Sequence, residues 1–363
     1  MGIEIDIRPV KSWLPTIDNP LLVSGPCSLE TEDQTLDTAR QLVKDHRVHI
    51  FRGGVWKPRT RPGSFEGIGS TGLEWLQKVK KETGLLVGTE VANAQHTEEA
   101  LKAGLDVLWI GARSTASPFV VQEIADVLKG TDAVVMVKNP VNPDVQLWIG
   151  AFERLNQAGI KNLVGIHRGF TPFRETKYRN YPNWTTFIEL RRLVPNLPVI
   201  CDPSHIAGKR EYLYEVAQKA FDMGMDGLMI ESHRDPDCAL SDKNQQVTPN
   251  DLAKILDRLV IRNVTVNNKQ FENQLEMLRT RIDALDTEMM EILASRVEIT
   301  RQIGHYKREN NVTALQINRW TELMNKRLSL AEKLNLNKTF VQILFQLIHE
   351  DSVRMQTEIL DEE

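Results

Sequence analysis

Short apolar runs alternate with helix-like stretches through the first 260 residues, and this alternation restricts the fold more than any other feature. Eight runs resemble β-strands, at residues 21–24, 48–52, 85–89, 107–110, 133–137, 162–166, 197–200 and 227–230. Stretches with helical spacing lie between them, at 33–43, 72–82, 97–103, 118–128, 145–157, 184–193 and 209–223. Runs that are apolar on both faces are typical of parallel strands covered by helices. The pattern predicts an α/β fold, a (β/α)8 TIM barrel, with a doubly wound open sheet as the alternative.

The pattern changes after residue 260, where strand-like runs cease. A barrel domain is expected at 1–262, a linker at 263–270 and a small all-α helical domain at 271–363. Apolar residues recur at helical spacing from Leu275 to Ile303, and a helix of that length spans on the order of 50 Å. Two further predicted helices, at 317–334 and 338–359, are too few to enclose it. We therefore expect an intertwined homodimer of helices.

Charge and composition exclude several classes of function. The net charge is -4, so nothing attracts the chain as a whole to nucleic acid or to an anionic membrane. The N-terminus lacks a signal-peptide pattern and no apolar run reaches membrane-spanning length, which favours a cytoplasmic protein. The 3 cysteines form no disulfide framework, which fits a reducing compartment. Any anion binding must come from a local cluster of cations.

Four residues of metal-binding types lie beyond predicted strands. They are Cys27, His205, Glu231 and Asp242. In a barrel the loops after the strands form one working face, so these side chains are expected to meet. A thiolate, an imidazole and two carboxylates suit a divalent Mn, Fe, Co or Zn ion, whereas Mg or Ca prefers oxygen ligands alone. The sequence therefore predicts a metalloenzyme.

Charged residues follow nearly every strand at the same end of the predicted barrel. They are Arg52, Lys57, Arg59, Glu90, Arg113, Lys138 and Arg168, with Thr60 and Ser114 among them. Arginine offers a rigid fork for phosphate or carboxylate, so several cations at one mouth indicate an anionic substrate. A single arginine at a strand end could equally bridge to a neighbouring loop, but the metal-binding types in the same layer favour a site.

These motifs together resemble the 3-deoxy-D-arabino-heptulosonate 7-phosphate (DAHP) synthase family over about residues 15–260. The resemblance rests on Gly25-Pro26-Cys27-Ser28, Lys57-Pro58-Arg59-Thr60, Gly111-Ala112-Arg113-Ser114 and the His205, Glu231, Asp242 series. The Lys-Pro-Arg-Thr segment separates it from sibling enzymes that use arabinose 5-phosphate and share the Gly-Pro-Cys start. That sibling, or another phosphoenolpyruvate aldolase, is the alternative.

The resemblance implies a reaction between phosphoenolpyruvate and erythrose 4-phosphate. It places Arg52, Lys57, Arg113, Lys138 and Arg168 around phosphoenolpyruvate. It gives Arg59, Thr60 and Ser114 to the sugar phosphate, and Cys27, His205, Glu231 and Asp242 to a metal that polarises the aldehyde. Lys57 and Glu90 are the expected proton-transfer residues.

The helical segment resembles the all-helical chorismate mutases over about residues 271–360. Arg296 and Lys307 are three helical turns apart and project from one face. The resemblance implies that Arg296 and Arg279, the latter from a partner protomer, bind the carboxylates of chorismate, while Lys307 and Gln356 face its ether oxygen. Arg319 and Ser352 would support the site. Gln316 and Trp320 depart from the family pattern, which has acidic residues there.

Three functions of the helical segment stay open at this point. It could catalyse the conversion of chorismate to prephenate. It could instead bind either compound as a sensor that restrains the barrel, with catalysis secondary. A third alternative is a dimerisation segment alone.

Overall fold

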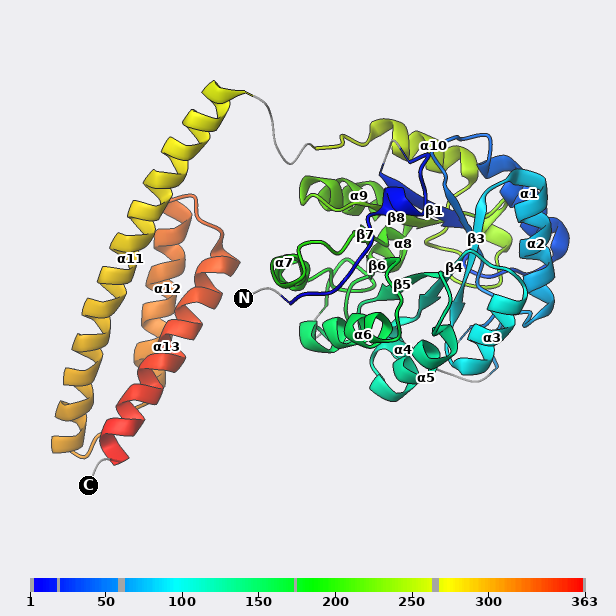
Figure 1. Cartoon of the computed structure of the whole chain (residues 1–363). Coiled ribbons are helices and arrows are strands. Elements are labelled where there is room, and N and C mark those ends of the chain that lie inside the picture. Colours follow the sequence, from blue (N-terminus) through cyan, green and yellow to red (C-terminus); the bar gives the residue numbers. More distant parts are fainter. Residues whose placement is uncertain (1–2, 18–19, 58–62, 173–174, 263–267, 362–363) are drawn as a thin grey trace. The chain divides into compact units, whose positions relative to one another are not determined.

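The computed structural model describes residues 3–17, 20–57, 63–172, 175–262 and 268–361. The chain divides into two compact units, Met1–Val264 and Thr265–Glu363 (Figure 1). Among the described residues no helix is both long and apolar enough to cross a membrane. The 3 cysteines are unpaired.

The first unit is a closed barrel of parallel strands, as the alternation predicts. Each strand pairs with the next along the chain, and β1 closes the barrel against β8. The strands are buried along almost their whole length, because helices cover the outside and side chains fill the inside. In the described residues they are β1 (Leu21–Gly25), β2 (Ile50–Arg52), β3 (Leu86–Val91), β4 (Val107–Ile110), β5 (Val134–Lys138), β6 (Leu163–His167), β7 (Val199–Cys201) and β8 (Gly227–Glu231).

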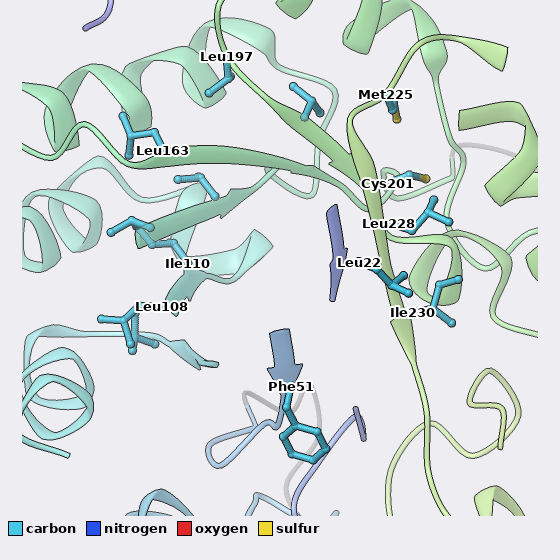
Figure 2. Packing of buried hydrophobic residues seen from close by; sticks show 14 of the residues in the cluster. Leu22, Phe51, Leu108, Ile110, Leu163, Leu197, Cys201, Met225, Leu228 and Ile230 are labelled. Atoms are coloured by element: carbon cyan, nitrogen blue, oxygen red, sulfur yellow. The ribbon is translucent and has the colours of Figure 1, made fainter. Parts of the chain in front are cut away.

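Alternate residues of the strands divide the apolar core into two layers. Val23, Trp109 and Met229 point into the barrel and pack on one another. Their neighbours Leu22, Leu108 and Leu228 face outward and pack against the helices; Figure 2 shows these three among the outer layer. The inner layer closes the barrel below the mouth, so a substrate can enter only from the loops.

The helices of this unit follow the strands in turn, and several begin with a side-chain cap. Thr31, Asn93, Asp144, Asp202 and Thr248 each accept a hydrogen bond from a backbone N–H in the first turn of their helix. The longer helices are α1 (Glu32–Leu42), α2 (Thr71–Thr83), α3 (Ala94–Lys102), α5 (Pro118–Leu128), α6 (Val145–Gln157), α7 (Trp184–Leu193), α9 (Leu213–Asp222) and α10 (Pro249–Arg258). Two short helices, α4 (Ala112–Thr115) and α8 (Pro203–Ala207), directly follow β4 and β7.

The second unit consists of three helices, α11 (Lys269–Glu309), α12 (Ile317–Lys333) and α13 (Lys338–Asp361). Both α11 and α12 pack against α13, and Figure 1 shows the first half of α11 in yellow, extending beyond the other two. The two helices α11 and α13 approach closely at Gly304, since a Cβ there would press on Ile359 of α13.

Most of the apolar face of α11 is uncovered. The buried residues of this helix are Thr300 and Gly304, whereas Ile282, Leu285 and Ile292 are 57%, 62% and 67% exposed. An isolated domain seldom leaves so much continuous apolar surface in water. The face is therefore a candidate contact surface.

Candidate functional site

The metal-binding residue types gather at the mouth of the barrel, at the ends of β1, β7 and β8. Gly25 ends β1 with a φ of 147°, and a Cβ there would collide with the carbonyl oxygen of Arg52. This turn carries Cys27 into a fully buried position, where its backbone N–H donates to Gln246 Oε1 at 2.9 Å. His205 lies on α8, directly after β7, and Glu231 is the last residue of β8.

The four predicted metal donors lie in two pairs. Cys27 Sγ is 3.2 Å from Asp242 Oδ2, and His205 Nε2 is 3.8 Å from Glu231 Oε1. The part of the chain that the structure describes contains no set of three or more such side chains already spaced to hold a metal ion. The four donor types nevertheless fit a metal ion. Glu231 Oε1 is buried and accepts no hydrogen bond from the described residues, so it is available as a ligand, although the Arg52 guanidinium lies beside it.

Cations contact two of these donors. Lys57 Nζ donates to Cys27 Sγ at 2.9 Å, and Arg52 Nη2 lies 3.2 Å from Glu231 Oε1. Burial, with Glu231 adding to it, raises the pKa of the Cys27 thiol to about 12. Burial also lowers the pKa of His205, which keeps a neutral ring ready to act as a ligand.

A cavity of about 380 Å³ opens beside these donors. Its lining contains eight of the residues predicted from the sequence: Lys57, Glu90, Arg113, Ser114, Lys138, Arg168, His205 and Asp242. Arg52, Cys27 and Glu231 are buried and are absent from this lining. Arg59 and Thr60 lie outside the described residues. The cavity thus presents a strongly cationic wall with carboxylates and an imidazole at one side.

The surroundings of Glu90 favour its ionised form. Burial would raise its pKa, but Lys138 and Lys57 outweigh that effect and lower the pKa to about 2. Lys138 Nζ lies 3.3 Å away, and Trp109 Nε1 donates to the same oxygen at 2.9 Å. A carboxylate with so low a pKa holds a proton poorly at neutral pH. This environment therefore favours a role for Glu90 in positioning Lys138, and it disfavours Glu90 as a general acid.

Several residues of the mouth were not among the sequence predictions. Arg179 Nη1 donates to Asp242 Oδ1 at 2.9 Å and to Gln245 Oε1 at 2.7 Å. Gln245 Nε2 in turn donates to Glu231 Oε2 at 2.7 Å. Asn180 joins Arg168 to the backbone of His205, with contacts of 2.9 and 2.6 Å. The loop after β6 thus fixes both the cations and the donors.

A second group of predicted residues meets between α11 and α13. Arg296 Nη1 donates to Ser352 Oγ at 2.6 Å. Lys307 Nζ donates to Gln356 Oε1 at 2.8 Å, and burial lowers the pKa of Lys307. Arg279 and Arg319 do not join this group; they contact Glu276 and Glu322 on their own helices. Trp320 stacks on His349 with ring centroids 4.0 Å apart.

Comparison with known families supports the two-part organisation. Residues 13–267 match the model of the DAHP synthetase I family. The chain belongs to this family. Residues 278–357 match chorismate mutase type II, so a DAHP synthetase I domain precedes a chorismate mutase domain. The two matches indicate an enzyme with a transferase or aldolase domain and an isomerase domain.

Relatives of the barrel carry two different names. The phospho-2-dehydro-3-deoxyheptonate aldolase of Thermotoga maritima is 29% identical over 226 residues, which is 62% of this chain and 64% of that protein. The chain thus spans less than two thirds of that relative's length. The 2-dehydro-3-deoxyphosphooctonate aldolase of Geotalea daltonii is 30% identical over 274 residues, 67% of this chain and 92% of that protein. The one of Desulfatibacillum aliphaticivorans is 30% identical over 264 residues, 66% of this chain and 90% of that protein.

Two solved structures share the barrel fold. The DAHP synthase crystal structure from Thermotoga maritima superposes with a TM-score of 0.60 and 26% identity, over 66% of this chain and 67% of that one. A truncated form of the Thermotoga maritima enzyme gives a TM-score of 0.58 over 66% of this chain and 84% of that one. Its identity of 24% supports the fold alone.

Proposed function

We propose that the barrel joins phosphoenolpyruvate to erythrose 4-phosphate, forming DAHP and releasing phosphate. The observation that carries this proposal is one cavity lined by Lys57, Arg113, Lys138 and Arg168 beside four potential metal donors. Phosphoenolpyruvate carries a carboxylate and a phosphate, and both need cations when they leave water. Arg52, buried beside Glu231, adds a further positive charge.

The chain's own residues would position the reactants. Lys138, Arg168 and the neighbouring cations would hold phosphoenolpyruvate with its C3 facing the aldehyde, so that a C–C bond forms there. Water then adds to C2 and phosphate leaves, with Lys57 Nζ as the proposed site of proton transfer. A divalent Mn, Fe, Co or Zn ion on Cys27, His205, Glu231 and Asp242 would supply Lewis-acid polarisation of the aldehyde.

The octonate relatives support a second candidate, a barrel that takes arabinose 5-phosphate. The segment Lys57-Pro58-Arg59-Thr60 favours erythrose 4-phosphate. Assays of the full chain with phosphoenolpyruvate and either sugar phosphate separate the two. Turnover with arabinose 5-phosphate and none with erythrose 4-phosphate would establish the second candidate.

Metal removal provides a prediction with an internal control. Dialysis against a chelator is expected to abolish condensation, because no residue replaces the Lewis acid, and addition of Mn²⁺ should restore it. The chorismate mutase reaction of the same sample should persist, since a pericyclic step needs no metal. Full condensation activity in protein shown to be metal-free by elemental analysis would remove the metal from the mechanism.

We infer that the helical unit converts chorismate to prephenate and also restrains the barrel. Lys307 and Gln356, joined at 2.8 Å, would face the ether oxygen, where negative charge develops. Arg296, held by Ser352, would bind a carboxylate. If the two units are coupled, prephenate must change barrel affinity and barrel substrates must change prephenate affinity by the same factor. Condensation rates unaffected by prephenate would refute the regulatory role.

We also propose a homodimer formed through the helical unit. The exposed apolar face of α11, including Ile282, Leu285 and Ile292, and the separation of Arg279 from the other site residues support it. Light scattering of the full chain should give about twice the mass of 41.4 kDa. Glutamate at both Leu285 and Ile292 should shift the mass toward the monomer, whereas glutamate at exposed Phe119 of α5 should not. A wild-type monomer would contradict the proposal.

A further inference from the structure

Asp202 is a buried carboxylate to which no role in the reaction has been given. It lies between β7 and α8 with 0% exposure, and its backbone N–H donates to the carbonyl oxygen of His167 at 2.8 Å. Its Oδ1 caps α8 by accepting from the backbone N–H of His205 at 3.0 Å. Its Oδ2 lies 2.7 Å from Nδ1 of the same histidine. One side chain therefore contacts both the backbone and the ring of His205.

The second contact determines which ring nitrogen is available. A neutral imidazole carries one N–H, and the other nitrogen has a free lone pair. A carboxylate oxygen facing Nδ1 places the proton there and leaves Nε2 free. Nε2 points toward Glu231, 3.8 Å away, which is the direction of the other proposed donors.

A buried cation lies beside Asp202. Lys138 Nζ lies 3.9 Å from Oδ2 and is shared with Glu90 at 3.3 Å. A carboxylate oxygen beside a cation accepts hydrogen bonds, so Oδ2 favours the tautomer of His205 that carries its proton on Nδ1.

We propose that Asp202 is a positioning residue that fixes the tautomer and the ring orientation of His205 so that Nε2 binds the divalent ion. The proposal rests on the metal site proposed above. A residue that only caps the helix would need Oδ1 alone, and its replacement by another good cap would leave the metal affinity unchanged. The two roles can be separated because they use different oxygen atoms.

The test variant is Asp202→Ser. Serine remains a good N-cap, yet its hydroxyl is too short to reach the ring of His205. Metal-stripped full-length protein is titrated with Zn²⁺ by calorimetry, and the variant should bind about 10- to 100-fold more weakly than the wild type. With Co²⁺, the visible bands should change because the histidine ligand is altered, while the near-ultraviolet band from the Cys27 thiolate should persist.

Asp144→Ser is the matched control. Asp144 caps α6 by accepting the same kind of hydrogen bond from the backbone N–H of Leu147, at 2.9 Å. The metal affinity of the Asp144→Ser variant should equal that of the wild type. If circular dichroism shows that Asp202→Ser is misfolded, Asp202→Asn, which is nearly isosteric, takes its place with the same expected weakening.

The outcomes distinguish the two proposals. Wild-type affinity and an unchanged Co²⁺ spectrum in a folded Asp202 variant would overturn the positioning role and leave the metal site intact. A wild-type chain that binds neither Zn²⁺ nor Co²⁺ would overturn the metal site itself. Weakening in the Asp202 variants together with an unchanged Asp144→Ser variant is the result expected.

Discussion

Replacing Arg52 with methionine is expected to lower the free energy of unfolding of the barrel by about 3–5 kcal/mol. Arg52 and Glu231 are 2% and 0% exposed, and their charged atoms lie 3.2 Å apart. Methionine keeps much of the volume, but it leaves the Glu231 carboxylate buried without its guanidinium partner. Urea unfolding of chelated protein, followed by tryptophan fluorescence, measures the loss, because all tryptophans except Trp320 lie in the barrel.

The double variant Arg52→Met/Glu231→Gln serves as the internal comparison. It removes both charges and should recover much of the stability lost in the single variant, because no unpaired buried charge remains. Arg8→Met breaks an ion pair with Asp132 whose side chains are 48% and 82% exposed, and it should cost less than about 1 kcal/mol. A single variant as stable as Arg8→Met would show that the buried pair is not a stabilising contact.

Replacing Lys307 with methionine is expected to reduce kcat for chorismate about 100- to 1000-fold, the usual effect of removing one donor to a developing oxyanion. Lys307 Nζ contacts Gln356 Oε1 at 2.8 Å and the carbonyl oxygen of Ala314 at 2.6 Å, so it is held in place before substrate arrives. Burial lowers its pKa. The wild-type rate should therefore fall with rising pH before an ordinary lysine, with a pKa of about 10.4, would deprotonate.

Lys326→Met is the control for this second prediction. Lys326 is an exposed lysine on α12 that pairs with Glu322, and its loss should leave both activities unchanged. Condensation by the barrel should survive Lys307→Met, because the two units have separate sites. A Lys307→Met enzyme with wild-type kcat would exclude Lys307 from the rearrangement. A wild-type chain that does not turn over chorismate would leave the helical unit as a sensor or a dimerisation segment.

The barrel could be predicted from the sequence because its strands and long helices carry strong periodic signals. The run at 107–110 and the helix at 118–128 coincide with β4 and α5. The short helices α4 and α8 escaped prediction, since four or five residues are too few for a helical period to appear. His205 was predicted to follow a strand, and it lies on α8.

The supporting residues of the site could not be read from the sequence. Gln246 binds the backbone of Cys27 across 219 residues, and Gln245 binds Glu231 from a polar segment that resembles a solvated loop. Such contacts depend on the closed barrel and leave no local pattern. Asp202 was not among the predicted site residues, and its two contacts with His205 become apparent only in three dimensions.

The exposed face of α11 has a consequence for how this protein must be handled and how it folds. If a second chain covers the apolar residues of α11, the stability of the helical unit depends on protein concentration. The unit then becomes less stable on dilution. Newly made chains would expose that face until they meet a partner, and this raises the risk of aggregation. We therefore expect melting temperatures of the helical unit that rise with protein concentration, alongside a barrel transition that does not.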